Sequence, residues 1–279
     1  MTTEVDEKQV GYFPSLFVFC PLPYKNSGNV FIREYGKVTY KMYTAGKGVP
    51  YGKIGRSVLS LLTTQAVLQN DRHIELGCIS DTARKLGIVN TTGGKTGNIG
   101  RITETFRQFG ELVIANESTI RQGEIEGFKI GKKLVITDEM ELYWNTKKRD
   151  EDETLPSLFE NYMNLTHDFY TFIRKNAVPV DIVAYTKMNS PRAQDIYSWV
   201  VRRLYGLKEQ TTIPWSALYG QFADNIDRRN KPVFRKDFTN ALLLAKAIYP
   251  EARIQADDLA GITLSPSPYH IDPKNLGYV

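Results

Sequence analysis

Apolar residues recur along the chain with two periods, and the alternation between them predicts a protein that mixes helices with strands. Runs rich in β-branched and aromatic residues, bounded by Pro, Gly and Asn, predict strands at residues 15–20, 29–34 and 38–43. A helical period then covers residues 55–69. A short strand at 73–76 leads to a helix at 81–86, for which Ser80 is the predicted cap.

The next helix has the clearest amphipathic pattern of the first half. Ile102, Phe106 and Phe109 follow the spacing i, i+4 and i+7, which places them on one buried face. Strands at 112–115 and 128–137 follow, so the order helix, helix, helix and hairpin predicts a winged helix with this helix in the recognition position. Its opposite face carries Gly97, Gly100, Arg101, Glu104, Arg107 and Gln108.

The second half repeats this order. Helices are predicted at 193–204, 213–222 and 234–248, and strands at 252–255 and 261–264 supply the hairpin. The helical period of the third helix buries Phe234, Phe238, Ala241, Leu242, Ala245 and Ile248. It leaves Lys236, Thr239, Asn240, Leu243 and Lys246 outward, with Arg235 at the edge.

A run of charges at residues 146–156 separates the halves. A basic triplet meets an acidic quartet and then a proline, and such a run indicates an exposed linker because it cannot pack into a core. The sequence therefore predicts an α+β fold of two tandem winged-helix domains, each a helix-turn-helix with a β-hairpin wing. The predicted divisions are a first domain at 1–147, a linker at 148–156 and a second domain at 157–279.

The segment before the first recognition helix, Gly93-Gly94-Lys95-Thr96-Gly97-Asn98-Ile99-Gly100-Arg101, suits close approach to phosphates. Glycine leaves the backbone N–H groups accessible, and two cations lie beside them. Gly94-Lys95-Thr96 resembles the end of a Walker A loop, but that motif requires a glycine where this chain has Val89. We therefore prefer the phosphates of a nucleic acid to those of a bound nucleotide.

Both recognition helices have basic residues near their beginnings, which favours DNA binding. Asn240 can contact adenine through two hydrogen bonds, and it follows five cations in nine residues. A solvated charged face or a protein-binding surface remains the alternative for each helix. The predicted DNA-binding residues are Lys95, Gly97, Asn98, Arg101, Arg107 and Gln108 in the first domain. In the second they are Arg228, Arg229, Lys231, Arg235, Lys236, Thr239, Asn240 and Lys246.

Composition agrees with a globular protein that has an anionic partner. The 279 residues carry a formal net charge of +5, and the isoelectric point is near 9.0. Two cysteines without metal spacing and three scattered histidines predict neither a disulfide framework nor a metal site. The acidic N-terminus has no apolar stretch behind it, so we expect no secretory signal, no membrane association, and a cytoplasmic location.

Enzyme classes that act on DNA find little support in the sequence, and we expect no catalytic activity and no cofactor. A rolling-circle nuclease needs closely spaced histidines for its metal, and the chain has no His-x-His pair. A helicase or partition ATPase needs the Walker A loop that Val89 interrupts. His73, His167 and His270 each fit a structural or surface position better than that of a catalytic base.

The chain resembles the RepA-type replication initiators of broad-host-range bacterial plasmids, from about Phe17 to Pro268. The resemblance rests on short motifs in a shared order: Val49-Pro50-Tyr51-Gly52-Lys53, Thr63-Thr64-Gln65-Ala66-Val67, Ile74-Glu75-Leu76-Gly77, Thr92-Gly93-Gly94-Lys95-Thr96-Gly97 with Arg101, Ala193-Gln194-Asp195-Ile196-Tyr197-Ser198-Trp199 and Ser265-Pro266-Ser267-Pro268. Lys95-Thr96 departs from the bulky residue expected after the paired glycines. The resemblance implies an initiator that binds repeated origin sites (iterons) in double-stranded DNA, helps to open the duplex and recruits host replication proteins such as the host initiator and the replicative helicase. It also implies autorepression as a dimer, a property linked to plasmid copy control.

Two alternatives to an initiator stay open. A winged-helix transcriptional repressor would use the same fold and the same kind of site, and a protein-interaction module would show little affinity for DNA. The aromatic residues of the first half suit either a core or a homodimer interface, so the first domain is expected to contact the DNA backbone, to dimerise, or both. The second domain is expected to recognise the origin sequence.

Overall fold

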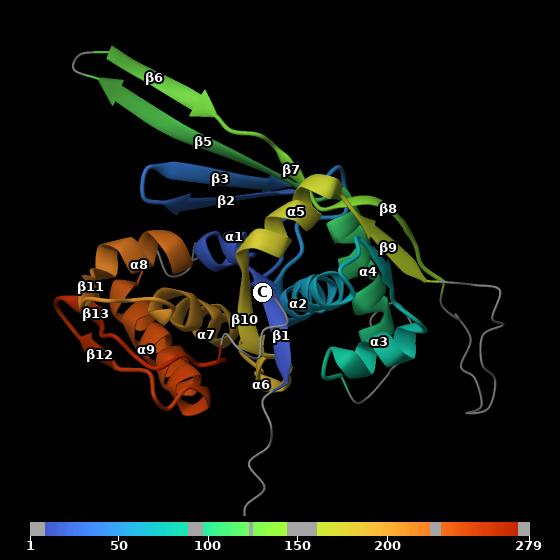
Figure 1. The fold of residues 1–279 in the computed structure, drawn as a ribbon. Coiled ribbons are helices and arrows are strands. Elements are labelled where there is room, and N and C mark those ends of the chain that lie inside the picture. The colour runs from blue at the N-terminus through green and yellow to red at the C-terminus, as the bar shows by residue number, and fades with distance from the viewer. Residues whose placement is uncertain (1–8, 89–96, 123–124, 144–160, 224–229, 273–279) are drawn as a thin grey trace, which may run out of the picture.

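The computed structural model describes residues 9–88, 97–122, 125–143, 161–223 and 230–272. Within them the chain forms a mixed α and β structure (Figure 1). The helices are α1 (Ser15–Phe19), α2 (Gly52–Gln69), α3 (Ile79–Lys85), α4 (Asn98–Glu111), α5 (His167–Asn176), α6 (Ile182–Lys187), α7 (Pro191–Leu204), α8 (Trp215–Phe222) and α9 (Lys231–Ile248).

The strands form four antiparallel sheets among the described residues. The largest has the order β2 (Val30–Tyr35), β3 (Val38–Tyr43), β5 (Val113–Gln122) and β6 (Ile125–Ile130), with β7 (Leu134–Val135) also paired to β5. A second has the order β4 (His73–Glu75), β9 (Tyr162–Leu165) and β8 (Thr137–Glu141). A third pairs β1 (Val10–Pro14) with β10 (Ala177–Asp181), and a fourth has the order β11 (Thr211–Ile213), β13 (Gly261–Leu264) and β12 (Ile254–Asp257).

The long amphipathic helices match the sequence pattern. Ile102, Phe106 and Phe109 are fully buried on α4, as their spacing predicts. The helix predicted at 234–248 begins earlier, at Lys231, because Pro232 occupies its first turn, where the missing N–H costs no hydrogen bond. The helix predicted at 213–222 begins later, at Trp215, because the preceding residues pair in β11.

Three local predictions are wrong. Residues 15–19 form the helix α1 and not a strand, since a short apolar run that is buried on most sides fits either element and β1 ends at Pro14. Helix α3 begins at Ile79, and the Cys78 sulfur, not Ser80, accepts the capping hydrogen bond from the Asp81 N–H. The predicted strand at 128–137 is divided among β6, β7 and β8, because β5 extends to Gln122 and pairs with β6.

Each half contains the order helix, strand, helix, helix and hairpin, but the pairings differ. In the second half, β11 precedes α8 and joins the β12–β13 hairpin in one sheet. In the first half, β4 pairs with β9 and the β5–β6 hairpin pairs with β3. The likeness of order therefore does not extend to the sheets.

Strands from before and after the predicted linker pair with one another. β1 pairs with β10 along five residues, and β9 lies between β4 and β8. The linker at 148–156 lies outside the described residues, and the division at 147 and 157 stays a prediction. These pairings attach residues 162–181 to the sheets of the first half.

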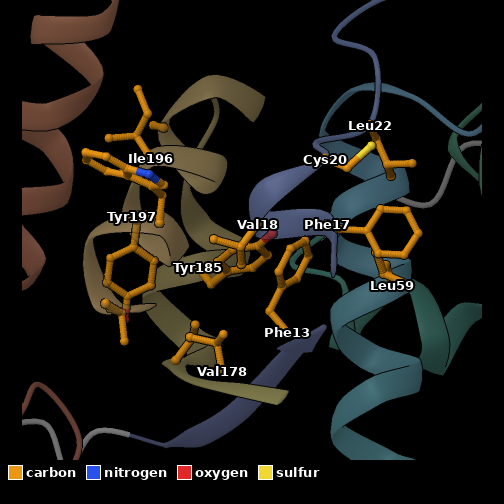
Figure 2. Close-up of a cluster of buried hydrophobic side chains, with 14 of the residues drawn as sticks. Phe13, Phe17, Val18, Cys20, Leu22, Leu59, Val178, Tyr185, Ile196 and Tyr197 are labelled. Atoms are coloured by element: carbon orange, nitrogen blue, oxygen red, sulfur yellow. The ribbon is translucent and has the colours of Figure 1, made fainter. Parts of the chain in front are cut away.

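One hydrophobic core runs across the middle of the molecule. Figure 2 shows part of it, where Phe13 from the first half lies beside Tyr185 from the second, and Phe17 lies beside Leu59 of α2. The rings of Phe13 and Tyr185 are 5.5 Å apart, within the range of favourable aromatic packing. In Figure 1, α3 and α4 lie on one side of these central elements and α9 lies on the other.

Candidate nucleic-acid interface

Helix α9 is held by an aromatic cluster that fixes its outward face. Phe234 and Phe238 are buried and pack edge-to-face against Trp215, with centroid distances of 6.5 and 5.8 Å. Phe238 also packs on Trp199 at 6.0 Å. The Asn230 side chain accepts a hydrogen bond from the Val233 N–H and caps the helix. The N-terminal half of α9 is therefore positioned by both its core face and its cap.

A hollow of about 490 Å³ lies against the outward face of α9 and is called the C-terminal hollow below. Lys236 and Asn240 are exposed there and Thr239 is half-buried, so these side chains are accessible to a ligand. The hollow is lined by Pro232, Arg235, Lys236, Thr239, Asn240 and Asp258. Four of the predicted DNA-binding residues thus meet in one place.

Arg235 is used differently from its neighbours. Its guanidinium donates to the Asp258 carbonyl oxygen at 2.7 Å and lies over the Trp215 ring at 5.6 Å. The Trp215 indole N–H in turn donates to the Asp257 carbonyl oxygen at 2.8 Å. Arg235 therefore connects α9 to the turn between β12 and β13, and it helps to position that turn beside the hollow.

The remaining predicted cations of the second half lie outside this lining. Lys231 is exposed in the first turn of α9, with its ammonium 5.8 Å from the Tyr219 ring centroid. Lys246 is exposed in the last turn, away from the hollow. Arg228 and Arg229 lie outside the described residues.

Helix α4 begins at Asn98, directly after the glycine-rich segment. Gly97 is its N-cap and has no side chain to accept a hydrogen bond, so the first backbone N–H groups depend on other partners. Such groups, together with the positive end of the helix dipole, attract anions. The predicted residue Lys95 lies outside the described residues.

A second hollow, of about 570 Å³ and called the N-terminal hollow below, lies between the beginnings of α2 and α4 and the end of α3. Cationic Lys53 and Arg101 line it, with Glu104 as an acidic neighbour. Its walls include Gly52, Gly87 and Gly100, where the absence of side chains leaves backbone exposed. The other lining residues are Tyr51, Ile54, Ser57, Leu86, Ile88, Asn98, Thr105 and Gln108.

Gln108 of α4 is not where the helical period placed it, whereas Arg107 faces outward as predicted. Gln108 is buried, not outward, and its amide donates to the Lys47 carbonyl oxygen at 3.0 Å. The cause is the loop at 46–48, which Glu111 holds against the helix by accepting from the N–H groups of Gly46 and Lys47. Arg107 is half-exposed, forms an ion pair with Glu104 at 3.6 Å and lies outside the hollow lining.

Lys53 belongs to the N-terminal hollow, although sequence reasoning did not select it. Its ammonium donates to the Asn189 side-chain oxygen at 3.3 Å, and partial burial lowers its pKa. Sequence reasoning gives no reason to select a lysine in the first turn of a long helix, because the helix dipole disfavours a cation there. Asp258 was missed for the opposite reason, since an acidic residue is not expected beside a basic helix.

The described residues give no metal-binding or membrane-spanning feature. No group of three or more His, Cys, Asp or Glu side chains is placed to hold a metal ion, and no described helix has the length and hydropathy for crossing a bilayer. Cys20 is buried, and this burial raises its pKa to about 12. Cys78 is exposed, and of the histidines only His270 is buried, against Tyr197.

Comparisons with known proteins address the identity of the chain. The crystal structure of domains 2 and 3 of RctB matches with a TM-score of 0.54 and 11% sequence identity, over 93% of this chain and 97% of that chain. Another RctB domain 2–3 structure, RctB-155-483, gives a TM-score of 0.45 and 11% identity over 85% and 83%. The first match shows a shared fold. No curated protein sequence matches the chain.

A family model described as plasmid-encoded RepA protein matches residues 49–217, which is more than half of the chain. This span contains α2, α4, the N-terminal hollow and the start of α8. It also contains five of the six motif blocks that carry the resemblance. The chain therefore belongs to the RepA-type family of plasmid replication initiators.

Proposed function

We propose that the chain binds repeated sites in duplex DNA at a plasmid origin through two winged helices, with α4 and α9 as the recognition helices. The C-terminal hollow is the observation that carries this proposal, because it gathers exposed Lys236 and Asn240 with Thr239 on a helix held rigidly from behind. Asn240 contacts a base edge, most favourably adenine, and Lys236 contacts phosphate.

The N-terminal hollow supports a second contact with the same duplex. Its cations, exposed glycine backbone and two helix beginnings suit a phosphate chain better than a base edge. Arg101 is exposed at its rim. In this proposal α4 holds the backbone and α9 supplies most of the sequence preference.

Opening of the origin, recruitment of host replication proteins and autorepression complete the proposal, as the family suggests. No chemical step is included: purified protein with Mg²⁺ and ATP is expected neither to cut origin DNA nor to hydrolyse ATP. A homodimer is supported by exposed apolar residues on the large sheet. Strand register places four of them on one face: Val30, Ile32, Phe128 and Ile130.

The test uses labelled duplexes from the origin of the parent plasmid and random duplexes of equal length. Footprinting first identifies the protected repeats. Wild-type affinity for the repeat is expected to fall roughly a hundredfold between 50 and 200 mM salt, as several phosphate contacts release counterions. A flat salt response, or equal affinity for both duplexes, would contradict the proposal.

A paired set of variants checks the assignment of a DNA contact to α9. Lys231→Ala is expected to weaken binding to repeat and random DNA alike, since a phosphate contact carries no sequence information. Lys208→Ala removes a charge at an exposed position outside both hollow linings and serves as the control. Equal effects of the two changes would remove α9 from the interface.

The repressor alternative is tested by replication itself. A plasmid that carries the origin repeats and depends on this protein in trans is expected to be maintained by the wild type and lost with Asn240→Ala. A single protected palindrome with no replication support would instead identify a repressor.

A further inference from the structure

A buried polar cluster joins the two halves between α2 and α7, and we call it the seam: Tyr24, Arg33, Arg56, Arg192 and Asp195. The guanidinium of Arg56 binds the Asp195 carboxylate through two hydrogen bonds, of 2.6 and 2.7 Å. Both side chains are almost completely buried, at 0% and 1% exposure. Arg56 also donates to the carbonyl oxygens of Leu22 and Pro23. The pair is thus fully satisfied and directional.

Contacts of the seam lead from one hollow to the other. Arg56 donates to the Gly52 carbonyl oxygen at 2.9 Å, and Gly52 lines the N-terminal hollow. The Tyr24 ring lies 4.9 Å from the guanidinium carbons of both Arg56 and Arg192. Arg192 lies 5.4 Å from the Phe234 ring, and Phe234 immediately precedes Arg235 of the C-terminal hollow.

Other polar contacts cross at the same place. Arg33 of β2 donates to the Ala223 carbonyl oxygen, just beyond α8, at 2.5 Å. Gln221 of α8 donates to the Val18 carbonyl oxygen at 2.8 Å, and the Gln194 amide donates to the Ser57 hydroxyl at 3.3 Å. Apolar side chains alone permit sliding between packed surfaces, whereas a planar guanidinium fork fixes both distance and angle. Because desolvation offsets the attraction within a buried ion pair, the net stability that such a pair adds is small.

We propose that the Arg56–Asp195 pair and Tyr24 are positioning residues that fix the separation of the two hollows, so that the chain recognises the spacing between two contact sites on DNA as well as their bases. This inference rests on the proposed function for its DNA component. Its geometric component is a fixed separation of α4 and α9, and it concerns the protein in the absence of DNA. The two components are measured separately.

The geometric measurement uses two spin labels and no DNA. In a Cys78→Ser background, Lys85→Cys on α3 and Ala247→Cys on α9 place labels at exposed positions on either side of the seam, while buried Cys20 stays unlabelled. The seam is altered by the double change Arg56→Met with Asp195→Leu, which replaces the ion pair with apolar groups of similar volume. Double electron–electron resonance is expected to give a distance distribution at least twice as wide as that of the parent.

Controls distinguish a looser connection between the two halves from unfolding of the protein. The exposed pair Arg72–Asp138, with 47% and 52% exposure, receives the same double change to Met and Leu and is expected to leave the distribution unchanged. Circular dichroism verifies folding, and Asp195→Asn, which keeps shape but removes the charge, provides a second seam variant. An unchanged width in a folded seam variant overturns the proposal, and so does the failure of both seam variants to fold.

The DNA measurement compares the origin repeat with a repeat that has one base pair inserted between the two footprinted contact regions. One base pair shifts the second region along the helix and rotates it about the axis, so wild-type affinity is expected to fall about tenfold or more. The seam double variant should bind the original repeat less tightly and lose less than threefold on insertion. Equal insertion penalties in both proteins overturn spacing recognition. If the wild type does not prefer the repeat to random DNA, the proposed function fails, while the spin-label distances still decide the geometric component.

Discussion

Helices α4 and α9 hold equivalent positions in the order of elements but carry different charge. α4 contains two arginines and two glutamates, whereas α9 contains four cations and one aspartate. The packing also differs: Gln108 of α4 is covered by the loop at 46–48, but Lys236 and Asn240 of α9 face a hollow. In the proposed function, one scaffold thus presents a backbone-holding surface and a base-contacting surface at two ends of one molecule.

The difference originates in what lies beside each helix. The beginning of α2 forms the other wall of the N-terminal hollow and narrows access to α4. Beside α9, the neighbour is the turn between β12 and β13, which Arg235 and Trp215 hold by hydrogen bonds to its carbonyl oxygens. A helix that lies beside a turn can enter a DNA groove more easily than a helix that faces another helix.

Charge reversal should give the largest contrast between the two helices. Lys236→Glu is expected to weaken binding to the repeat roughly a hundredfold at low salt, and Arg101→Glu roughly tenfold, because α9 carries four cations and one aspartate whereas α4 carries two arginines and two glutamates. Both values come from duplex titrations at several salt concentrations. A larger loss for Arg101→Glu would show that α4 contributes more to the free energy of binding than α9 does.

Removal of one side chain should separate base contact from backbone contact. Asn240→Ala is expected to cost about 1–3 kcal/mol on the repeat and to relax preference at one base position, with little change on random DNA. Competition with a library of singly substituted repeats measures this effect. Equal loss on repeat and random duplexes would show that Asn240 does not contact a base.

The caps of the two helices predict a smaller contrast in stability. Asn230→Ala removes the side-chain acceptor at the start of α9 and should lower the free energy of unfolding by about 1 kcal/mol. Gly97→Ser adds an acceptor at the start of α4, where the backbone is already extended, and should raise it by about half that amount. Urea denaturation of each variant tests both signs, and a loss of stability in Gly97→Ser would contradict the cap assignment.

The smallest effect is expected for Arg107→Ala. Arg107 is half-exposed, pairs with Glu104 on the helix surface and does not line the N-terminal hollow. An ion pair of this kind contributes about 0.5 kcal/mol or less to stability. Duplex affinity should change less than twofold, and a strong loss would extend the DNA contact beyond the hollow.

Sequence reasoning predicted the features that depend on the local helical period. It failed where contacts with distant segments determine which side chains are buried. The faces of α4 and α9 follow from the spacing of Phe106, Phe109, Phe234 and Phe238, which is visible without a structure. The burial of Gln108 depends on a loop 61 residues earlier, so no helical pattern reveals it.

The seam is a stronger case of the same limit. Arg56 and Asp195 are 139 residues apart, and each lies in an ordinary helical segment. Most residues that line the C-terminal hollow lie close together on one helix, so sequence reasoning could predict them. The N-terminal hollow combines three helices, which explains why Lys53 was overlooked.

The pairing of β1 with β10 also has a consequence during synthesis, because the two strands are made at different times. β1 is made early, but Pro14 pairs with Ala177 and Val10 with Asp181, so its partner leaves the ribosome only much later. At about 5–20 residues per second, the strand waits roughly ten to thirty seconds for its partner strand. A chain that stops before residue 177 is therefore released with an open strand edge at residues 10–14.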